Sequence, residues 1–265
     1  MNPMPIVDFQ NWKRAARAQL RFIPAAPRRG MLVFLILGLL LVLTRSCSIS
    51  LNLPNQKLAI SGLAGVYPLF LIGAALWAMS IWYREGPSQR DYHWTLPVDR
   101  RVHDVLRVFS GAAWLLLFLA VPVLVGMVMH YISAPSEQTG GIPAWIWIAH
   151  LTGPLTLYLL CSTASLRSDH PGLWVFGAPI AVVTVWGVLS FWDFPVIPDL
   201  IWTVLLGRMG LLKVLGLPLL TEIELSLQRD IDSGLMIATG LSAAFLWVFL
   251  GALAVLASGY RYRQS

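Results

Sequence analysis

Six long stretches of the chain contain no Asp, Glu, Lys or Arg. They cover Met31–Thr44, Ser61–Tyr83, Val108–Ser136, Gln138–Leu166, His170–Trp192 and Ser233–Tyr260. A helix rises 1.5 Å per residue, so about 20 apolar residues cross the ~30 Å hydrocarbon core of a bilayer. Five stretches reach this length. The first reaches it when it is extended through Arg45 into residues 46–51, with the Arg45 side chain directed to the headgroups. The pattern predicts six membrane-spanning helices.

A different pattern, with apolar positions spaced by three and four residues, covers residues 8–23. One face carries the apolar residues Phe9, Trp12, Ala16, Leu20 and Ile23. The opposite flank carries the basic residues Arg14, Arg17 and Arg21. Asp8 is placed to cap the helix and Pro24 to stop it. A helix with an apolar face and a basic face is typical of one that lies in the membrane interface, so these residues are expected to form an interfacial helix. A passive anchor is the alternative.

Residues 193–232 have the least regular pattern. Their apolar part, residues 201–220, contains Arg208, Lys213 and several glycines. As a seventh span it would bury two cations and place the basic C-terminal tail outside, against the usual orientation of basic residues. We therefore expect a re-entrant segment or an outer-leaflet helical hairpin before the last span, with a seven-span topology as the alternative.

The composition agrees with a membrane protein. Apolar residues make up 57% of the 265 positions and charged residues only 12%, whereas a soluble domain has about 25% charged residues. The two cysteines exclude a disulfide framework and a Cys-rich metal or iron–sulfur site. They are Cys47 and Cys161, predicted near opposite membrane faces and expected to be small packing residues. The net charge of +6 is small for a nucleic-acid binder, so no nucleic-acid partner is expected. Residues 1–265 are predicted to form a single domain.

The basic residues predict the orientation of the chain. Fourteen of the 19 Lys and Arg residues lie before the first span, between the second and third, between the fourth and fifth, or in the C-terminal tail. Basic residues accumulate on the cytoplasmic side of membrane proteins. Both termini are therefore predicted to be cytoplasmic, in a multi-pass protein of a bacterial-type inner (cell) membrane.

The sequence contains few catalytic or cofactor-binding motifs that would indicate an enzyme. The chain contains no G-x-x-x-x-G-K-[ST] phosphate-binding loop and no H-E-x-x-H zinc motif. His130 and His150 lie singly on neighbouring stretches, which disfavours a bis-histidine haem site. No long span carries a charged residue at its centre, as proton-coupled or ion-coupled carriers usually require. The chain is predicted to be a pathway whose energy comes from a partner, with no cofactor of its own.

The most informative segment lies between the second and third predicted spans. It reads Tyr-Arg-Glu-Gly-Pro-Ser-Gln-Arg-Asp-Tyr-His-Trp-Thr-Leu-Pro-Val-Asp-Arg-Arg over residues 83–101. A span that ends in Arg-Glu, a short polar helix and then Leu-Pro-Val-Asp-Arg resembles the permease subunits of type-2 ATP-binding-cassette (ABC) exporters. That family combines an interfacial N-terminal helix, six spans, a coupling helix in the first cytoplasmic loop and outer-leaflet helices before the last span. The chain offers a counterpart for each feature.

The resemblance implies roles for individual residues of the loop 84–105. Glu85 corresponds to the acidic residue that closes the second span, and residues 88–95 to the coupling helix. Pro97 disfavours helix at the preceding residue, which allows the coupling helix to lie parallel to the membrane. The residues expected to contact an ATPase are Glu85, Arg90, Tyr92, His93, Trp94, Leu96, Pro97 and Arg100. A merely solvated loop is the alternative.

The resemblance also implies partners. Two permease subunits, as a homodimer or with a sister chain, form the pathway, and two ATPase subunits bind ATP and Mg on the cytoplasmic side. Membrane lipid surrounds the spans. The chain itself is then not an enzyme, since ATP hydrolysis occurs in the partner. The alternatives are a non-transport anchor or scaffold subunit of a larger complex and, less favoured, an intramembrane enzyme.

Overall fold

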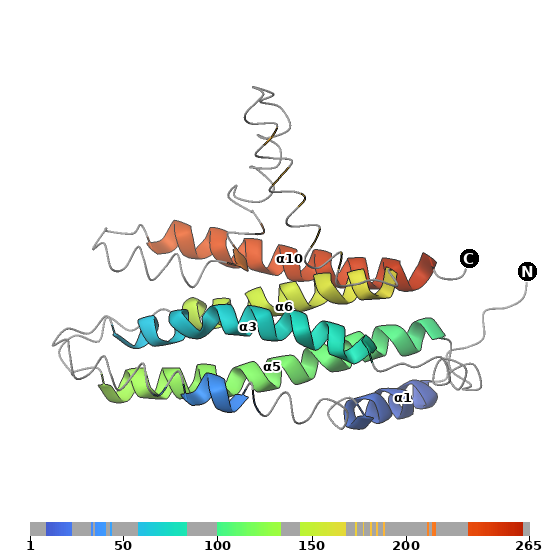
Figure 1. Ribbon diagram of the computed structural model, residues 1–265, viewed down its shortest axis with the longest axis horizontal. Coiled ribbons are helices and arrows are strands. Elements are labelled where there is room, and N and C mark those ends of the chain that lie inside the picture. The colour runs from blue at the N-terminus through green and yellow to red at the C-terminus, as the bar shows by residue number, and fades with distance from the viewer. Residues whose placement is uncertain are drawn as a thin grey trace, which may run out of the picture.

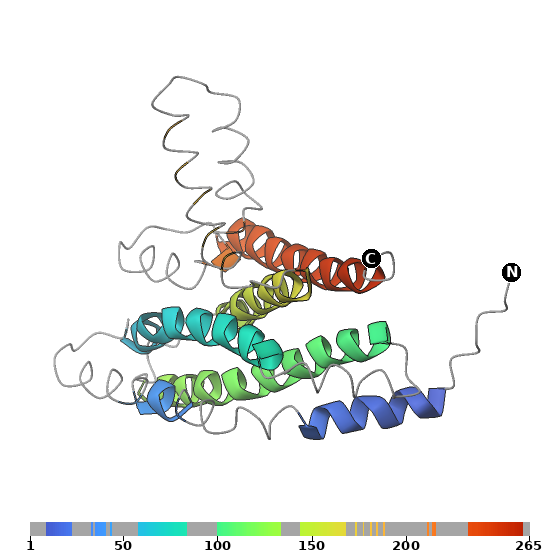
Figure 2. The ribbon, with the colours of Figure 1, turned by 45° about the vertical axis from the view of Figure 1, so that its right-hand side comes forward.

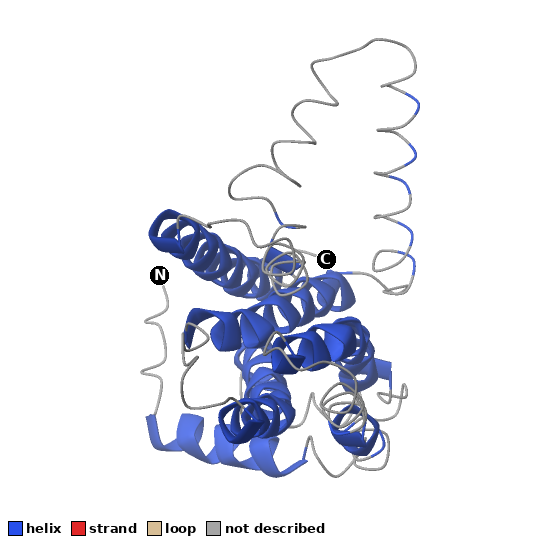
Figure 3. Cartoon of the chain, turned by 90° about the vertical axis from the view of Figure 1, so that its left-hand side faces the viewer, coloured by secondary structure: helices blue, strands red, loops and turns tan. Residues whose placement is uncertain are grey.

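The computed structural model describes residues 9–22, 33, 35–40, 43, 58–83, 100–133, 144–167, 173, 177, 181, 184, 188, 211, 214–215 and 233–261. Every described residue is helical and none belongs to a strand, which confirms an all-α fold for this part of the chain (Figure 3). The five continuous helices are α1 (Phe9–Phe22), α3 (Leu58–Tyr83), α5 (Arg100–Ser133), α6 (Ala144–Arg167) and α10 (Ser233–Arg261).

These helices overlap four of the predicted spans and the predicted interfacial segment, with bounds that differ from the predicted ones. Within the described residues, one helical segment, Val102–Val128 of α5, is long and apolar enough to cross a membrane. Tyr67–Ile81 in α3 and Ser242–Ala257 in α10 are shorter apolar segments. The count of six spans stays a prediction. Helix α5 begins at Arg100, eight residues before the charge-free stretch, because charged residues are compatible with the first turns of a helix.

The long helices form a bundle in which α6 lies between α3 and α10 (Figure 1). Helices α3, α6 and α10 run in one direction along the bundle, and α5 runs in the opposite direction (Figure 1). Helix α1 lies beside the first half of α5, at the end of the bundle where α3, α6 and α10 finish (Figure 2). This arrangement brings the first turns of α5 and the last turns of the other three long helices to the same end.

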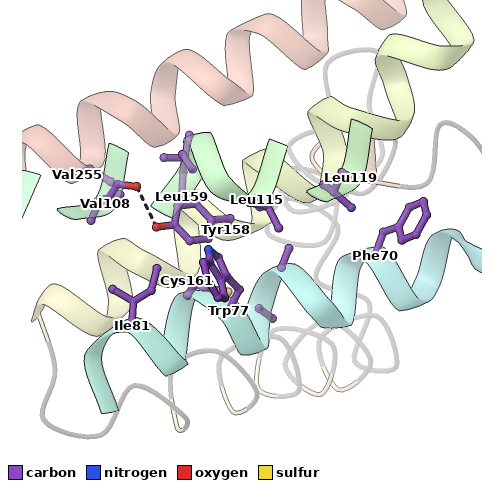
Figure 4. Packing of buried hydrophobic residues seen from close by; sticks show 14 of the residues in the cluster. Phe70, Trp77, Ile81, Val108, Leu115, Leu119, Tyr158, Leu159, Cys161 and Val255 are labelled. Carbon is purple, nitrogen blue, oxygen red and sulfur yellow. Dashed lines mark hydrogen bonds between the residues drawn. The ribbon is translucent and has the colours of Figure 1, made fainter. Parts of the chain in front are cut away.

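The core is made by α3, α5 and α6, with Val255 contributed by α10 (Figure 4). Two buried hydrogen bonds to α5 carbonyls lock these helices together: Trp77 Nε1 donates to Gly111 O at 3.0 Å, and Tyr158 Oη donates to Val108 O at 2.9 Å. Gly111 is needed at this contact, because a Cβ atom there would overlap the Tyr158 hydroxyl and the Ile81 side chain. Cys161 is buried in the same core, as expected for a packing residue.

The outside of the bundle is also apolar. Large hydrophobic side chains that are half or more exposed include Ile72 of α3, Leu117, Leu124 and Val128 of α5, and Phe245 and Phe249 of α10. Soluble monomers rarely expose such patches over several elements.

Candidate functional site

The basic residues of the five continuous helices gather at one end of the bundle. They are Lys13, Arg14, Arg17 and Arg21 of α1, Arg100, Arg101 and Arg107 of α5, Arg167 of α6 and Arg261 of α10. These positions fall where α5 begins and where α6 and α10 finish, beside α1 (Figure 1). The opposite ends of α3, α5, α6 and α10 carry no Lys or Arg. We refer to this cluster of nine residues as the basic end.

Helix α1 contacts α5 through two side-chain hydrogen bonds. The Gln19 amide and His103 Nε2 lie 2.5 Å apart, and Trp114 Nε1 donates to Leu20 O at 2.9 Å. These contacts come from the same end of α1, so its second half is fixed against about the first four turns of α5. A helix is confirmed over Phe9–Phe22 of the predicted residues 8–23, with an attachment to α5 that its amphipathic pattern did not reveal, while its place in the membrane interface stays a prediction.

The basic side chains of α1 described by the structure point to the surface. Lys13, Arg14 and Arg17 are exposed. The side chains of Phe9, Trp12 and Arg21, also predicted to meet the membrane surface, lie outside the part of the chain whose side chains are described. A basic surface beside the bundle end can attract anionic headgroups.

His103 connects α1 to an acidic residue of α5. It is buried, and its Nδ1 lies 3.5 Å from Asp104 Oδ1. Asp104 is the one acidic residue in the sequences of the five continuous helices. The imidazole therefore lies between a neutral amide of α1 and a carboxylate on its own helix.

Arg107 joins the two helix ends that flank the predicted coupling loop. Its Nη2 donates a hydrogen bond to Ile81 O, in the last turn of α3. The last carbonyls of a helix have no intrahelical partner, so this guanidinium caps α3 from α5.

The predicted coupling residues Glu85, Arg90, Tyr92, His93, Trp94, Leu96 and Pro97 lie outside the described residues. Arg100 is described as the first residue of α5 and belongs to the basic end. Of the segment 193–232, residues 211, 214 and 215 are described, and all three are helical. Val214 is buried against Ala243 and Ala244 of α10, so at least this part of the segment packs into the bundle.

Sequence reasoning did not single out Arg107, Gln19, His103 or Trp114 as contact residues. Each is polar or amphipathic within an ordinary helical pattern, and its partner lies 26 to 94 positions away. Among the described residues, no group of three or more His, Cys, Asp or Glu side chains could hold a metal ion.

Comparison with known proteins adds no family assignment. No protein-family model matches the chain, and no curated protein or solved structure matches it either.

Proposed function

We propose that the chain is a membrane-spanning permease subunit of an ABC exporter of the type-2 class. In this proposal it forms half of a translocation pathway, with a second copy or a sister chain as the other half. A separate ATPase binds and hydrolyses ATP with Mg at the cytoplasmic face. The chain has six spans, the interfacial helix α1 and an outer-leaflet or re-entrant segment before the last span, and both termini are cytoplasmic.

Two features of the bundle support a membrane location. Its exterior carries exposed large hydrophobic side chains on α3, α5 and α10. Its nine helical basic residues lie at one end, as the accumulation of Lys and Arg on the cytoplasmic side of membrane proteins would produce. A bilayer would cover the exterior, and the basic end would lie in the cytoplasm beside anionic headgroups.

The observation that carries the proposal is the Arg107 contact. Residues 84–99 carry the sequence that resembles a coupling loop, and Arg107 holds together the two helices from which this loop emerges. A coupling element must transmit a push from a partner into the spans. A loop whose two flanking helices are joined by a charge-assisted hydrogen bond would move them as a unit.

The mechanism follows from this connection. ATP-driven closure of the ATPase subunits would press on the loop, with Tyr92 and Trp94 as the bulky contacts. The movement would pass through Arg107 to α3 and α5, which share the core with α6. A tilt of these helices would open the pathway on the opposite side of the membrane.

The test removes the two bulky contacts. We expect the double variant Tyr92→Ala, Trp94→Ala to insert normally but to lose co-purification with its ATPase, because a few aromatic anchors supply most of the free energy of a small interface. Gln138→Ala, in the loop predicted on the other face, is the matched control and is expected to retain the ATPase.

Unchanged co-purification and unchanged substrate-stimulated ATP hydrolysis in the double variant would contradict the proposal. The loop would then be a solvated connector, and an anchor or scaffold role would account better for the chain.

A further inference from the structure

Tyr67 of α3 is a buried side chain whose hydroxyl makes no hydrogen bond to the described residues. Its exposed fraction is 0%, and its Oη has no hydrogen-bond partner among the described residues. Its ring makes an edge-to-face contact with the buried His150 imidazole of α6, with ring centroids 5.5 Å apart. Tyr158, which is equally buried, instead donates its hydroxyl to Val108 O.

Three elements converge at this hydroxyl. A Cβ atom on Gly153 of α6 would overlap the Tyr67 hydroxyl and would lie 3.4 Å from Val214 O. Val214 in turn packs against Ala243 and Ala244 of α10. The Tyr67 hydroxyl therefore lies where α3, α6 and the segment around residue 214 meet, and small residues line the contact.

This meeting point lies deep in the bundle. Tyr67 follows the start of α3 by nine residues, and Gly153 follows the start of α6 by nine residues, which corresponds to about 14 Å along each helix. Pro68 and Pro154 also interrupt the backbone hydrogen-bond ladders of α3 and α6 beside it.

A buried hydroxyl without a partner destabilises a fold, so its presence calls for an interaction outside the described contacts. The surroundings limit what that interaction can be. The sequences of α3, α6 and α10 contain no charged residue except Arg167 and Arg261, both at the basic end. An uncharged region that contains the Tyr67 hydroxyl and the His150 imidazole suits a neutral hydrogen-bonding group carried on an apolar molecule.

We propose that Tyr67, with His150 beside it, forms a site for the hydroxyl or carbonyl group of a neutral, lipid-like molecule that crosses the membrane along this chain. The proposal rests on the transport function proposed above and names its substrate class. The site is closed in this structure, since Tyr67, His150 and Val214 are all buried. Alternating access requires such a closed state.

The experiment uses the full chain in phosphatidylcholine nanodiscs with a photoreactive diacylglycerol. Wild-type protein is expected to be labelled on peptides of α3 or α6. Tyr67→Phe removes only the hydroxyl, and we expect labelling of these peptides to fall at least fivefold. Tyr158→Phe, the matched control in the same core, is expected to stay within twofold of wild type.

A stability measurement separates a binding role from a structural one. The thermal midpoint of Tyr67→Phe is expected to equal or exceed that of wild type, because the variant loses an unpartnered hydroxyl. The midpoint of Tyr158→Phe is expected to fall. A Tyr67→Phe midpoint lowered as much as that of Tyr158→Phe would overturn the proposal, since the hydroxyl would then serve the fold.

The choice of probe tests the substrate class. A photoreactive phosphatidate with the same acyl chains is expected to label α3 and α6 less than diacylglycerol does. Stronger labelling by phosphatidate, labelling insensitive to Tyr67→Phe, or no labelling of wild type would each overturn the site.

The assay contains no ATPase. Failure of ATPase co-purification with labelling retained would therefore contradict the exporter mechanism alone, and the reverse result would contradict the site alone.

Discussion

At the scale of single residues, Gly111 shows how a glycine leaves room for a tyrosine hydroxyl in the bundle core. Gly111 of α5 accepts the Trp77 indole hydrogen bond at its carbonyl and leaves room at its Cα for Tyr158 and Ile81. Tyr158 cannot move away from a larger residue at position 111 without losing its hydrogen bond to Val108 O. Gly111 therefore allows close packing and also preserves this buried hydrogen bond.

Gly111→Ala is expected to lower the free energy of unfolding by about 1–3 kcal/mol, because the added methyl group overpacks the core against Tyr158 and Ile81. Equilibrium unfolding in detergent would measure the change. Gly177→Ala is the matched control, since a Cβ atom there meets nothing within 4 Å. It is expected not to lower stability, because Ala is more favourable than Gly within a helix by about 0.5–1 kcal/mol.

Adding Tyr158→Phe to Gly111→Ala removes the nearest clashing atom. The double variant is therefore expected to lose less stability than the sum of the two single variants. Additive losses would show that the clash is relieved elsewhere and would contradict this account of the glycine.

At the scale of elements, the sequence predicts where helices lie better than it predicts what they contact. The charge-free stretches locate α3, α5, α6 and α10, and the spacing of three and four residues locates α1. Both patterns are local, so they can be read directly. The charge-free stretches also place Tyr67 and His150 within spans, but nothing local says that these two side chains meet.

The contacts of α1 illustrate the same limit. Gln19 and His103 are 84 positions apart, and either one could be satisfied by water on a solvated helix. In the sequence, Arg107 is one of several basic residues near a predicted cytoplasmic loop. Its contact with the last turn of α3 is visible only in the folded chain. Which side chains meet depends on how whole helices pack against each other. The packing of whole helices depends on residues throughout the chain, so it cannot be predicted from a local pattern.

The fixed position of α1 leads to a prediction about lipid charge. Replacing Arg14, Arg17 and Arg21 with Glu reverses an attraction of about 1 kcal/mol per basic residue to anionic headgroups. Wild-type protein is expected to be more stable to heat in anionic nanodiscs than in neutral ones. The triple variant is expected to lose or reverse this difference, while Gln10→Glu, a single change on the same helix, should largely retain it.

High salt should reduce the wild-type difference, since screening weakens interactions at the surface. Equal stability of wild type in both lipids would mean that α1 is a passive extension held only by Gln19 and Trp114.

At the scale of the whole molecule, helix directions bear on the number of crossings. Helices α3 and α10 run the same way along the bundle (Figure 1). Two spans that run in the same direction are separated by an odd number of other spans. The six-span topology places three spans between α3 and α10, whereas a seventh span in residues 201–220 would place four between them and reverse α10. The observed directions therefore agree with three spans between α3 and α10 and disagree with a seventh span in residues 201–220, while the total of six stays a prediction.

The last prediction tests this topology from outside the cell. In a background with Cys47→Ala and Cys161→Ala, an impermeant thiol reagent is expected to label Gln138→Cys but neither Gln89→Cys nor Gln264→Cys. Gln138 follows α5 at the end of the bundle without helical basic residues, whereas Gln89 and Gln264 follow α3 and α10 at the basic end. Permeabilised cells supply the control, because all three cysteines should then react. Labelling of Gln264→Cys with Gln89→Cys protected would require α10 to run against α3, and would replace the six-span arrangement with seven. Labelling of Gln89→Cys would place the proposed coupling loop outside the cell, where no ATPase could reach it.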